Sequence, residues 1–147
     1  MTQLATFVLV HGANLGGWCW QDVQTVLEAH GHEVICPSLD LSLTASLDRH
    51  IADVAELIVS RDLQGIVLVG HSYGGMVITG VADRAQDRIA RLVYLDAAVP
   101  GDGDDLASHI PGLSAAEVEE RRAFYRSLSA DGLWLAPPPL QWVGITD

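Results

Sequence analysis

The stretch Gly70-His71-Ser72-Tyr73-Gly74 decides how the rest of this sequence is interpreted. It directly follows an apolar run at 66–69 and directly precedes a segment with helical character at 75–85. A serine with a glycine two residues to either side, placed between a strand and a helix, is the pattern of a nucleophile elbow. Strand and helix pass so close in such a turn that side chains at Gly70 and Gly74 would clash. The pattern predicts that Ser72 is a nucleophile, and a glycine-rich turn with a structural serine is the alternative.

Two backbone N–H groups near this turn are candidates for binding an oxyanion. The N–H of Tyr73 lies at the start of the predicted helix, where backbone donors point outward. The loop His11-Gly12-Ala13-Asn14 follows another apolar run, at 4–10. Active sites in parallel α/β sheets gather at the carboxyl ends of the strands, so this loop and the elbow should face one crevice. Ala13 is the best candidate for the second donor, and an ordinary glycine-rich turn is the alternative.

Apolar and amphipathic segments alternate along the first hundred residues. Strands are expected at 4–10, 33–36, 66–69 and 89–95, and helices at 18–30, 46–60 and 75–85. The helix at 46–60 should bury Leu47, Ile51, Val54, Ala55 and Ile58, and the helix at 18–30 should turn Trp20, Val23, Val26 and Leu27 to one side. This order predicts an α/β fold with a parallel sheet covered by helices on both faces.

The character of the chain changes after Pro100. An acidic turn at 101–105 is followed by a helix expected at 114–129, with Ser114 as N-cap and Glu117 at the capping-box spacing. The end of the chain holds three consecutive prolines between Trp134 and Trp142, which suggests an extended and partly apolar segment. We therefore divide the chain into a core at 1–105 and a further segment at 106–147.

Composition excludes several classes of protein. The chain has 147 residues, 49% of them hydrophobic, which suits one packed domain. Eight basic and 19 acidic residues give a net charge of −11, so nucleic acid and anionic membrane surfaces are not expected partners. Cys19 and Cys36 form no disulfide or zinc pattern, and no metal or other cofactor is expected. The N-terminus lacks a basic region and no run approaches the ~18–20 apolar residues that span a bilayer, so we expect a cytoplasmic protein.

These features together resemble the α/β-hydrolase superfamily. The matching stretches are 7–13, 17–20, 31–34, the elbow, 92–97 and Pro100. They most resemble the branch of plant methyl-ester esterases, hydroxynitrile lyases and bacterial esterases, over about residues 4–105. The resemblance implies that Ser72 is the nucleophile, that Ala13 and Tyr73 supply the oxyanion N–H groups, and that 106–147 begins a helical lid. Many relatives have a histidine where this chain has Leu15, which is expected to alter the edge of the pocket.

The general base is not assigned by this resemblance. A serine hydroxyl needs a histidine oriented by an acid, and in this superfamily both follow on later strands. No stretch after Pro100 resembles those strands, so we interpret the chain as about the first three-fifths of such an enzyme. His109 is the only histidine with the required chain order, preceded by Asp96 or Asp102. An internal Ser72–His109–Asp96 system is therefore an alternative, although relatives commonly carry a non-catalytic aspartate at the position of Asp96.

The remaining histidines are expected to have structural roles. His11 should shape its loop, His71 should pack away from Ser72, and His50 should lie on a solvated helix face. His30 and His32 flank the end of a predicted helix and should cap it or face solvent.

The favoured function is that of a serine hydrolase acting on small carboxylic esters by acyl transfer. Hydroxynitrile lyase chemistry often uses a lysine near the site and is less favoured, since all eight basic residues are arginines. A non-catalytic fragment or small-molecule binding module is the other alternative. The strand at 89–95 would be an open apolar edge, so we also expect a homo-oligomer, formed through this edge or through the segment between Trp134 and Trp142.

Overall fold

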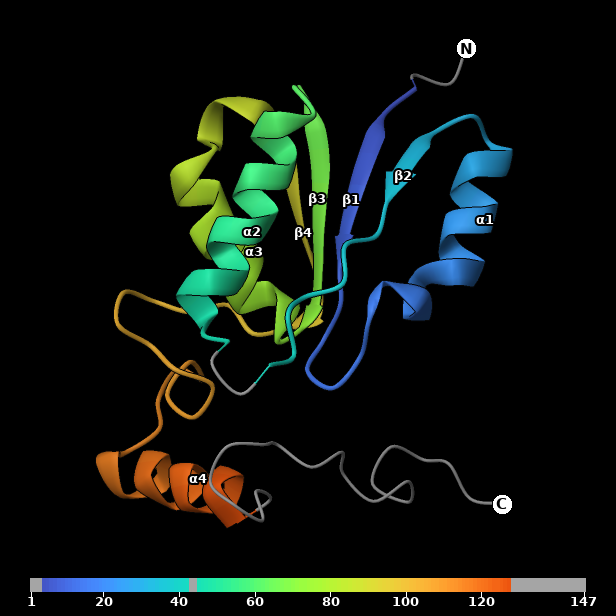
Figure 1. Ribbon diagram of the computed structural model, residues 1–147. Helices are drawn as coiled ribbons and strands as arrows, with labels where there is room; N and C mark the ends of the chain where they lie inside the picture. The colour runs from blue at the N-terminus through green and yellow to red at the C-terminus, as the bar shows by residue number, and fades with distance from the viewer. Residues whose placement is uncertain (1–3, 43–44, 128–147) are drawn as a thin grey trace, which may run out of the picture.

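The computed structural model describes residues 4–42 and 45–127 (Figure 1). Its elements are β1 (Thr6–Val10), a 3₁₀ helix (Gly17–Trp20), α1 (Gln21–Ala29), β2 (Glu33–Ile35), α2 (Leu47–Ser60), β3 (Ile66–Ser72), α3 (Gly74–Arg84), a second 3₁₀ helix (Gln86–Arg88), β4 (Ile89–Ala97) and α4 (Ala115–Ser127). This is the predicted alternation, with boundaries that differ by a few residues. The first strand begins at Thr6, because Leu4 is exposed and lies before the sheet.

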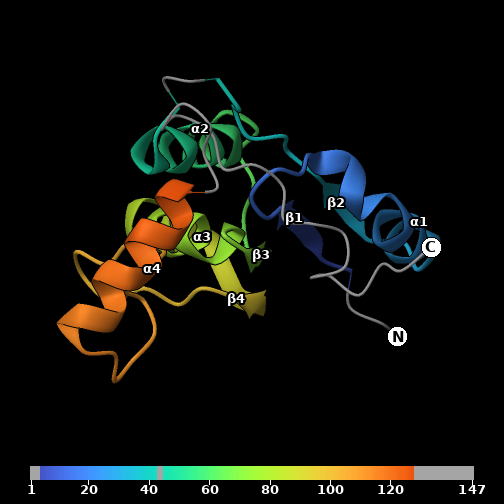
Figure 2. The ribbon, with the colours of Figure 1, turned by 90° about the horizontal axis from the view of Figure 1, so that it is seen from below.

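The four strands form one parallel sheet in the order β2-β1-β3-β4. Helix α1 lies on one face, and α2 and α3 lie on the other (Figures 1 and 2). The predicted α/β fold with both faces covered is therefore confirmed. Val10 at the end of β1 is in register with Gly70 near the end of β3. The loop after β1 and the turn after β3 consequently leave the sheet side by side.

The apolar core is divided by the sheet into two clusters. Successive residues of a strand point to opposite faces. Val8 and Val10 accordingly pack in the cluster with α2 and α3, whereas Leu9 packs with Trp20 on the face of α1. Helix α2 begins where the Ser46 hydroxyl accepts a hydrogen bond from the N–H of Arg49 (3.1 Å). The apolar face predicted for this helix contributes to the larger cluster, and its members are Leu47, Ile51, Val54, Ala55 and Ile58.

The prediction for residues 18–30 is partly wrong. A 3₁₀ turn that ends at Trp20 precedes α1, so the segment is not one helix. Trp20 is buried and Leu27 is partly buried, but Val23 and Val26 are 43% and 57% exposed. Because α1 packs at the β2 end of the sheet, only a narrow stripe of the helix meets another element. Helical spacing alone does not indicate how wide that stripe is.

Helix α4 begins with the predicted capping box. The Glu117 carboxylate accepts from the N–H of Ser114 (2.8 Å), and the Ser114 hydroxyl accepts from the N–H of Glu117 (3.3 Å). Trp134 and Trp142 lie outside the described residues, and the division of the chain at 105/106 stays a prediction. In the described ranges no helix is long and apolar enough to cross a membrane, and no group of three or more His, Cys, Asp and Glu residues could hold a metal ion.

Candidate active site

Ser72 occupies a strained position at the carboxyl end of β3. Its φ of 52° is in the left-handed region, which residues other than glycine seldom adopt. The Ser72 carbonyl accepts a hydrogen bond from the N–H of Ala98 (3.0 Å), which ties the turn to the segment after β4. The residue is exposed, and its side chain makes no hydrogen bond with any residue in the described ranges. The hydroxyl is thus displayed at the sheet edge rather than used to hold the fold.

The glycines around Ser72 are required by close backbone contacts. A Cβ atom at Gly70 would lie 2.6 Å from the carbonyl oxygen of Gly74. A Cβ atom at Gly74 would lie 2.6 Å from the carbonyl oxygen of Val10. Real Cβ atoms do not approach backbone oxygen so closely, so the clash expected from the sequence is present at both positions. The fold therefore accepts this sharp turn only with glycine on both sides.

The loop after β1 lies directly against the elbow. A Cβ atom at Gly12 would lie 3.1 Å from the Cβ atom of Ser72 and 3.1 Å from Nδ1 of His71. Ala13, the next residue, lines the same cavity as Tyr73. Among the described residues, no hydrogen-bond acceptor is paired with the backbone N–H of Ala13 or of Tyr73. The residues of the two predicted oxyanion donors therefore line one cavity, and no described residue accepts a hydrogen bond from either N–H group.

The cavity beside these donors has a volume of about 250 Å³. Its lining residues come from the β1 loop, the segment before α2, α2 itself, the elbow and the turn after β4, and they are His11, Gly12, Ala13, Asn14, Leu39, Asp40, Leu41, Ser42, Ala45, His50, Tyr73 and Leu106. The apolar side chains provide most of the wall, and no arginine is part of it. A cavity of this size and composition suits a small, uncharged organic molecule.

His11 shapes the β1 loop, as predicted. It is fully buried, its Nδ1 donates to the carbonyl oxygen of Gly12 (2.7 Å), and its Nε2 accepts from the N–H of Leu39 (2.9 Å). A ring that donates at one nitrogen and accepts at the other is neutral. Burial lowers the pKa of His11, which favours the same neutral form. His71 also has its predicted role, because its ring packs edge-on against Trp20, with the ring centroids 6.3 Å apart.

The prediction that His50 is solvated is wrong. His50 is buried on the flank of the apolar face of α2 and lines the cavity. Its Nδ1 is 2.8 Å from the hydroxyl of Tyr73, and its Nε2 is 2.6 Å from the carbonyl oxygen of Asp40. The positions 47, 50, 51, 54 and 58 share helical spacing, so the burial had a signal in the sequence. The two hydrogen-bond partners that make the burial of a polar ring tolerable had none.

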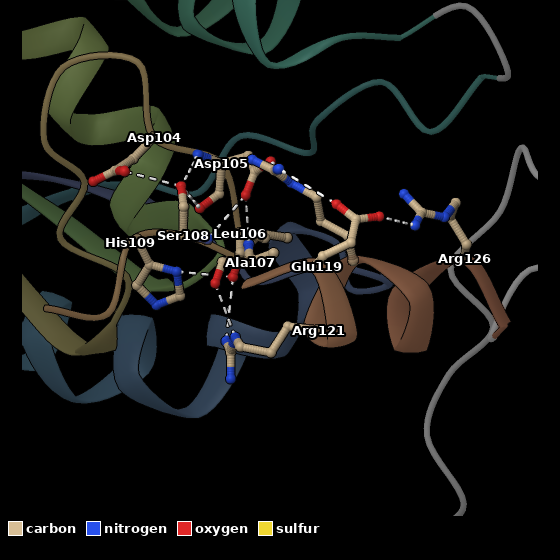
Figure 3. Close-up of polar contacts among 10 residues, drawn as sticks. Asp104, Asp105, Leu106, Ala107, Ser108, His109, Glu119, Arg121 and Arg126 are labelled. Carbon is tan, nitrogen blue, oxygen red and sulfur yellow. Dashed lines mark hydrogen bonds and ion pairs between the residues drawn. The ribbon is translucent and has the colours of Figure 1, made fainter. Parts of the chain in front are cut away.

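Among the described residues, the side chains of His109 and Asp96 form no hydrogen bond with that of Ser72. His109 lies in the turn 104–109, and its Nδ1 donates to the carbonyl oxygen of Leu106 (2.9 Å; Figure 3). Asp96 is exposed at the end of β4, with a φ of 44°. In the part of the chain that the structure describes, no hydrogen bond or ion pair joins these two residues to each other or to Ser72. The Ser72–His109–Asp96 system stays a prediction.

Helix α4 holds the turn that carries His109 and Leu106. Figure 3 shows Arg121 reaching from α4 to this turn, where it donates to the carbonyl oxygens of Ala107 (2.9 Å) and Leu106 (3.3 Å). Arg122, one residue on, pairs with the carboxylate of Asp105 (2.8 Å). Leu106 belongs to the cavity wall, so α4 acts on the shape of the site through the turn. Leu106 has no signal in the sequence as a site residue, because nothing in its local pattern indicates a cavity.

The chain is similar to known α/β-hydrolases and esterases. A family model described as "Alpha/beta hydrolase family" matches residues 7–147. The carbendazim hydrolyzing esterase of Nocardioides sp. (strain SG-4G) is 48% identical over 123 residues, which cover 78% of this chain and 51% of that protein. Methylesterase 2 of Arabidopsis thaliana is 35% identical over 141 residues, which cover 88% of this chain and 48% of that protein.

The fold of this chain also matches that of a solved α/β-hydrolase structure. An extracellular α/β-hydrolase from a Paenibacillus species, described as sharing structural and functional homology with tobacco salicylic acid binding protein 2, matches with a TM-score of 0.73 and 30% sequence identity. The match covers 84% of this chain and 52% of the solved one. The chain thus spans about half the length of these relatives.

Proposed function

This chain belongs to the alpha/beta hydrolase family, and from that premise we propose that it supplies the serine nucleophile and the oxyanion donors of an esterase for small carboxylic esters. One observation carries the proposal. Ser72 is exposed on a strained turn, and the adjacent cavity is lined by Ala13 and Tyr73, whose N–H groups are unpaired among the described residues. Donors that have no acceptor in the described part of the fold are what a developing oxyanion requires.

The proposed reaction is an acyl transfer in two steps. The hydroxyl oxygen of Ser72 attacks the ester carbonyl carbon, and the carbonyl oxygen takes up negative charge between the N–H groups of Ala13 and Tyr73. The alcohol leaves with a proton, and water then releases the acid from the acyl-serine. A base must accept the proton of Ser72 in the first step. His109 is the described histidine whose chain order fits that role.

The cavity supports a small and neutral substrate. Its volume of about 250 Å³ and its leucine and alanine walls favour a compact apolar ester. No arginine lines it and the chain contains no lysine, so nothing in the described wall would stabilise a second negative charge on the substrate. Relatives that are named esterases and methylesterases support the same class of reaction.

A binding function without turnover is the second candidate. The observation in its favour is that no described histidine forms a hydrogen bond with Ser72. A cavity lined by two residues whose N–H groups are unpaired in the described part of the chain could bind a small carbonyl compound without turnover.

Intact-mass spectrometry after exposure to a fluorophosphonate, together with hydrolysis of a short-chain aryl ester, tests the proposal. We expect one adduct per chain and measurable hydrolysis, both lost in Ser72→Ala. Hydrolysis that persists in His109→Ala would exclude His109 as the base. A wild-type chain that is folded by circular dichroism, but neither labelled nor active, would reject the esterase proposal and leave the binding function.

A further inference from the structure

We propose that His50 is a positioning residue that holds the Tyr73 oxyanion donor in place through the phenol of Tyr73. The inference rests on the proposed function, in which the N–H of Tyr73 binds the oxyanion. His50 comes from the middle of α2, 23 residues before Tyr73 in the chain. The two rings meet edge-on, with centroids 5.8 Å apart and planes at 82°. No step of the proposed reaction uses this buried histidine.

The direction of the hydrogen bonds is determined by the chemistry of the partners. The carbonyl oxygen of Asp40 can only accept, so Nε2 of His50 carries the hydrogen of the 2.6 Å bond. In the neutral ring Nδ1 is then an acceptor, and the hydroxyl of Tyr73 donates to it over 2.8 Å. Burial raises the pKa of Tyr73 to about 12, which keeps this phenol protonated as a donor at neutral pH. A single chain of hydrogen bonds therefore runs from Tyr73 through His50 to the backbone of Asp40.

These hydrogen bonds hold the residue next to the strained backbone of the elbow. Ser72, directly before Tyr73, has the left-handed φ of 52°, and such backbone persists only when its surroundings hold it. The backbone of Tyr73 is held on one side by its carbonyl, which accepts from the N–H of Met76 (2.9 Å). Its side chain is held by His50. Loss of the second anchor allows the peptide between Ser72 and Tyr73 to relax, and that peptide carries the oxyanion N–H.

An effect on the donor should appear in kcat rather than KM. An oxyanion donor acts mainly in the transition state, and its complete removal in other enzymes costs about 10²–10³-fold in kcat. A displaced donor should cost less than a missing one. We therefore expect His50→Leu to lower kcat by about 10-fold, with KM changed by less than about twofold.

Four further variants separate positioning from a general effect on folding. His50→Asn keeps an acceptor oxygen near the place of Nδ1, and it should recover most of the kcat lost in His50→Leu. Tyr73→Phe removes the phenol oxygen and should resemble His50→Leu, while the double variant His50→Leu/Tyr73→Phe should be no slower than either single one. Arg49→Gln is the matched control, because Arg49 lies on the same helix but is exposed, and among the described residues its side chain pairs with Asp53 alone. It should leave kcat unchanged.

The experiment measures kcat and KM per active site, counted by fluorophosphonate labelling, together with the amide ¹H–¹⁵N signal of Tyr73. We expect that signal to move in His50→Leu and to return toward its wild-type position in His50→Asn. Unchanged kcat in His50→Leu, or equal losses in the Leu and Asn variants, would overturn the inference. Absence of hydrolysis in the wild type would reject the proposed function instead. The amide signal would then decide the inference, and a Tyr73 signal that stays in place in His50→Leu would reject it.

Discussion

The interior of the sheet and its margin at β4 differ in how well they are covered. In the interior, the last three residues of β1 are at most 2% exposed, with a strand on either side and helices above and below. At the margin, Val93 and Leu95 of β4 are 39% and 49% exposed, and β4 pairs with β3 alone among the described strands. The proposed nucleophile and both proposed oxyanion donors lie at the ends of the interior strands β1 and β3. Among the described residues, the open margin contributes Leu106 to the cavity but no group bonded to the side chain of Ser72.

The forces that hold the two parts also differ. The elbow is held by backbone contacts that leave no space for a Cβ atom, and by the partly buried hydrogen bond between Tyr73 and His50. The turn after β4 is held by arginines of α4, a helix with no buried residue. Exposed ion pairs contribute only about 0–1 kcal/mol each. A substitution should therefore cost much more in the elbow than in the turn.

The largest expected effect is on stability, in Gly74→Ala. The new methyl group would lie 2.6 Å from the carbonyl oxygen of Val10, so strand and helix must separate. We expect a loss of about 3 kcal/mol or more in the free energy of unfolding, measured by urea denaturation. Gly103→Ala is the matched change in the open part, where φ is 78° but nothing lies within 4 Å. It should cost about 1 kcal/mol, and equal losses in the two variants would contradict the comparison.

A second effect is expected on association. Val93 and Leu95 lie on an apolar edge of the kind that pairs with other chains, so the wild type should sediment as an oligomer at micromolar concentration. Leu95→Arg should shift it toward monomer. Val59→Arg provides the control, because Val59 is 52% exposed on α2, away from that edge. A wild type that is strictly monomeric would show that the edge alone does not drive association.

The smallest effect is expected from Arg121→Gln. This change removes donors to the carbonyl oxygens of Leu106 and Ala107, and so loosens one wall of the cavity. On the proposed function, we expect KM to rise about two- to fivefold with little change in kcat, because the wall binds substrate and transition state alike. Arg126→Gln, which alters only an exposed pair with Glu119, should leave both constants unchanged. A fall in kcat with unchanged KM would contradict this prediction, because it would show that the turn acts on the transition state rather than on substrate binding.

Predictions from local patterns succeeded where the cause is itself local. The spacing of Gly70 and Gly74 indicated a close approach, and the structure has it. The capping box at Ser114 and the buried face of α2 also depend on residues within a few positions of each other. The positions of Val23 and Val26 could not be predicted in this way, because their exposure depends on how much of α1 meets the sheet.

The sequence by itself determined the order of strands and helices, the elbow with Ser72, and the loop that carries Ala13. These follow from sterics and periodicity within short segments, which a linear chain displays directly. Only the tertiary structure decided that His50 is buried against Tyr73 and that Leu106 lines the cavity. Each of these depends on which distant segments meet across the sheet. A hydrogen bond between residues 23 positions apart has no signature in the spacing of neighbouring residues.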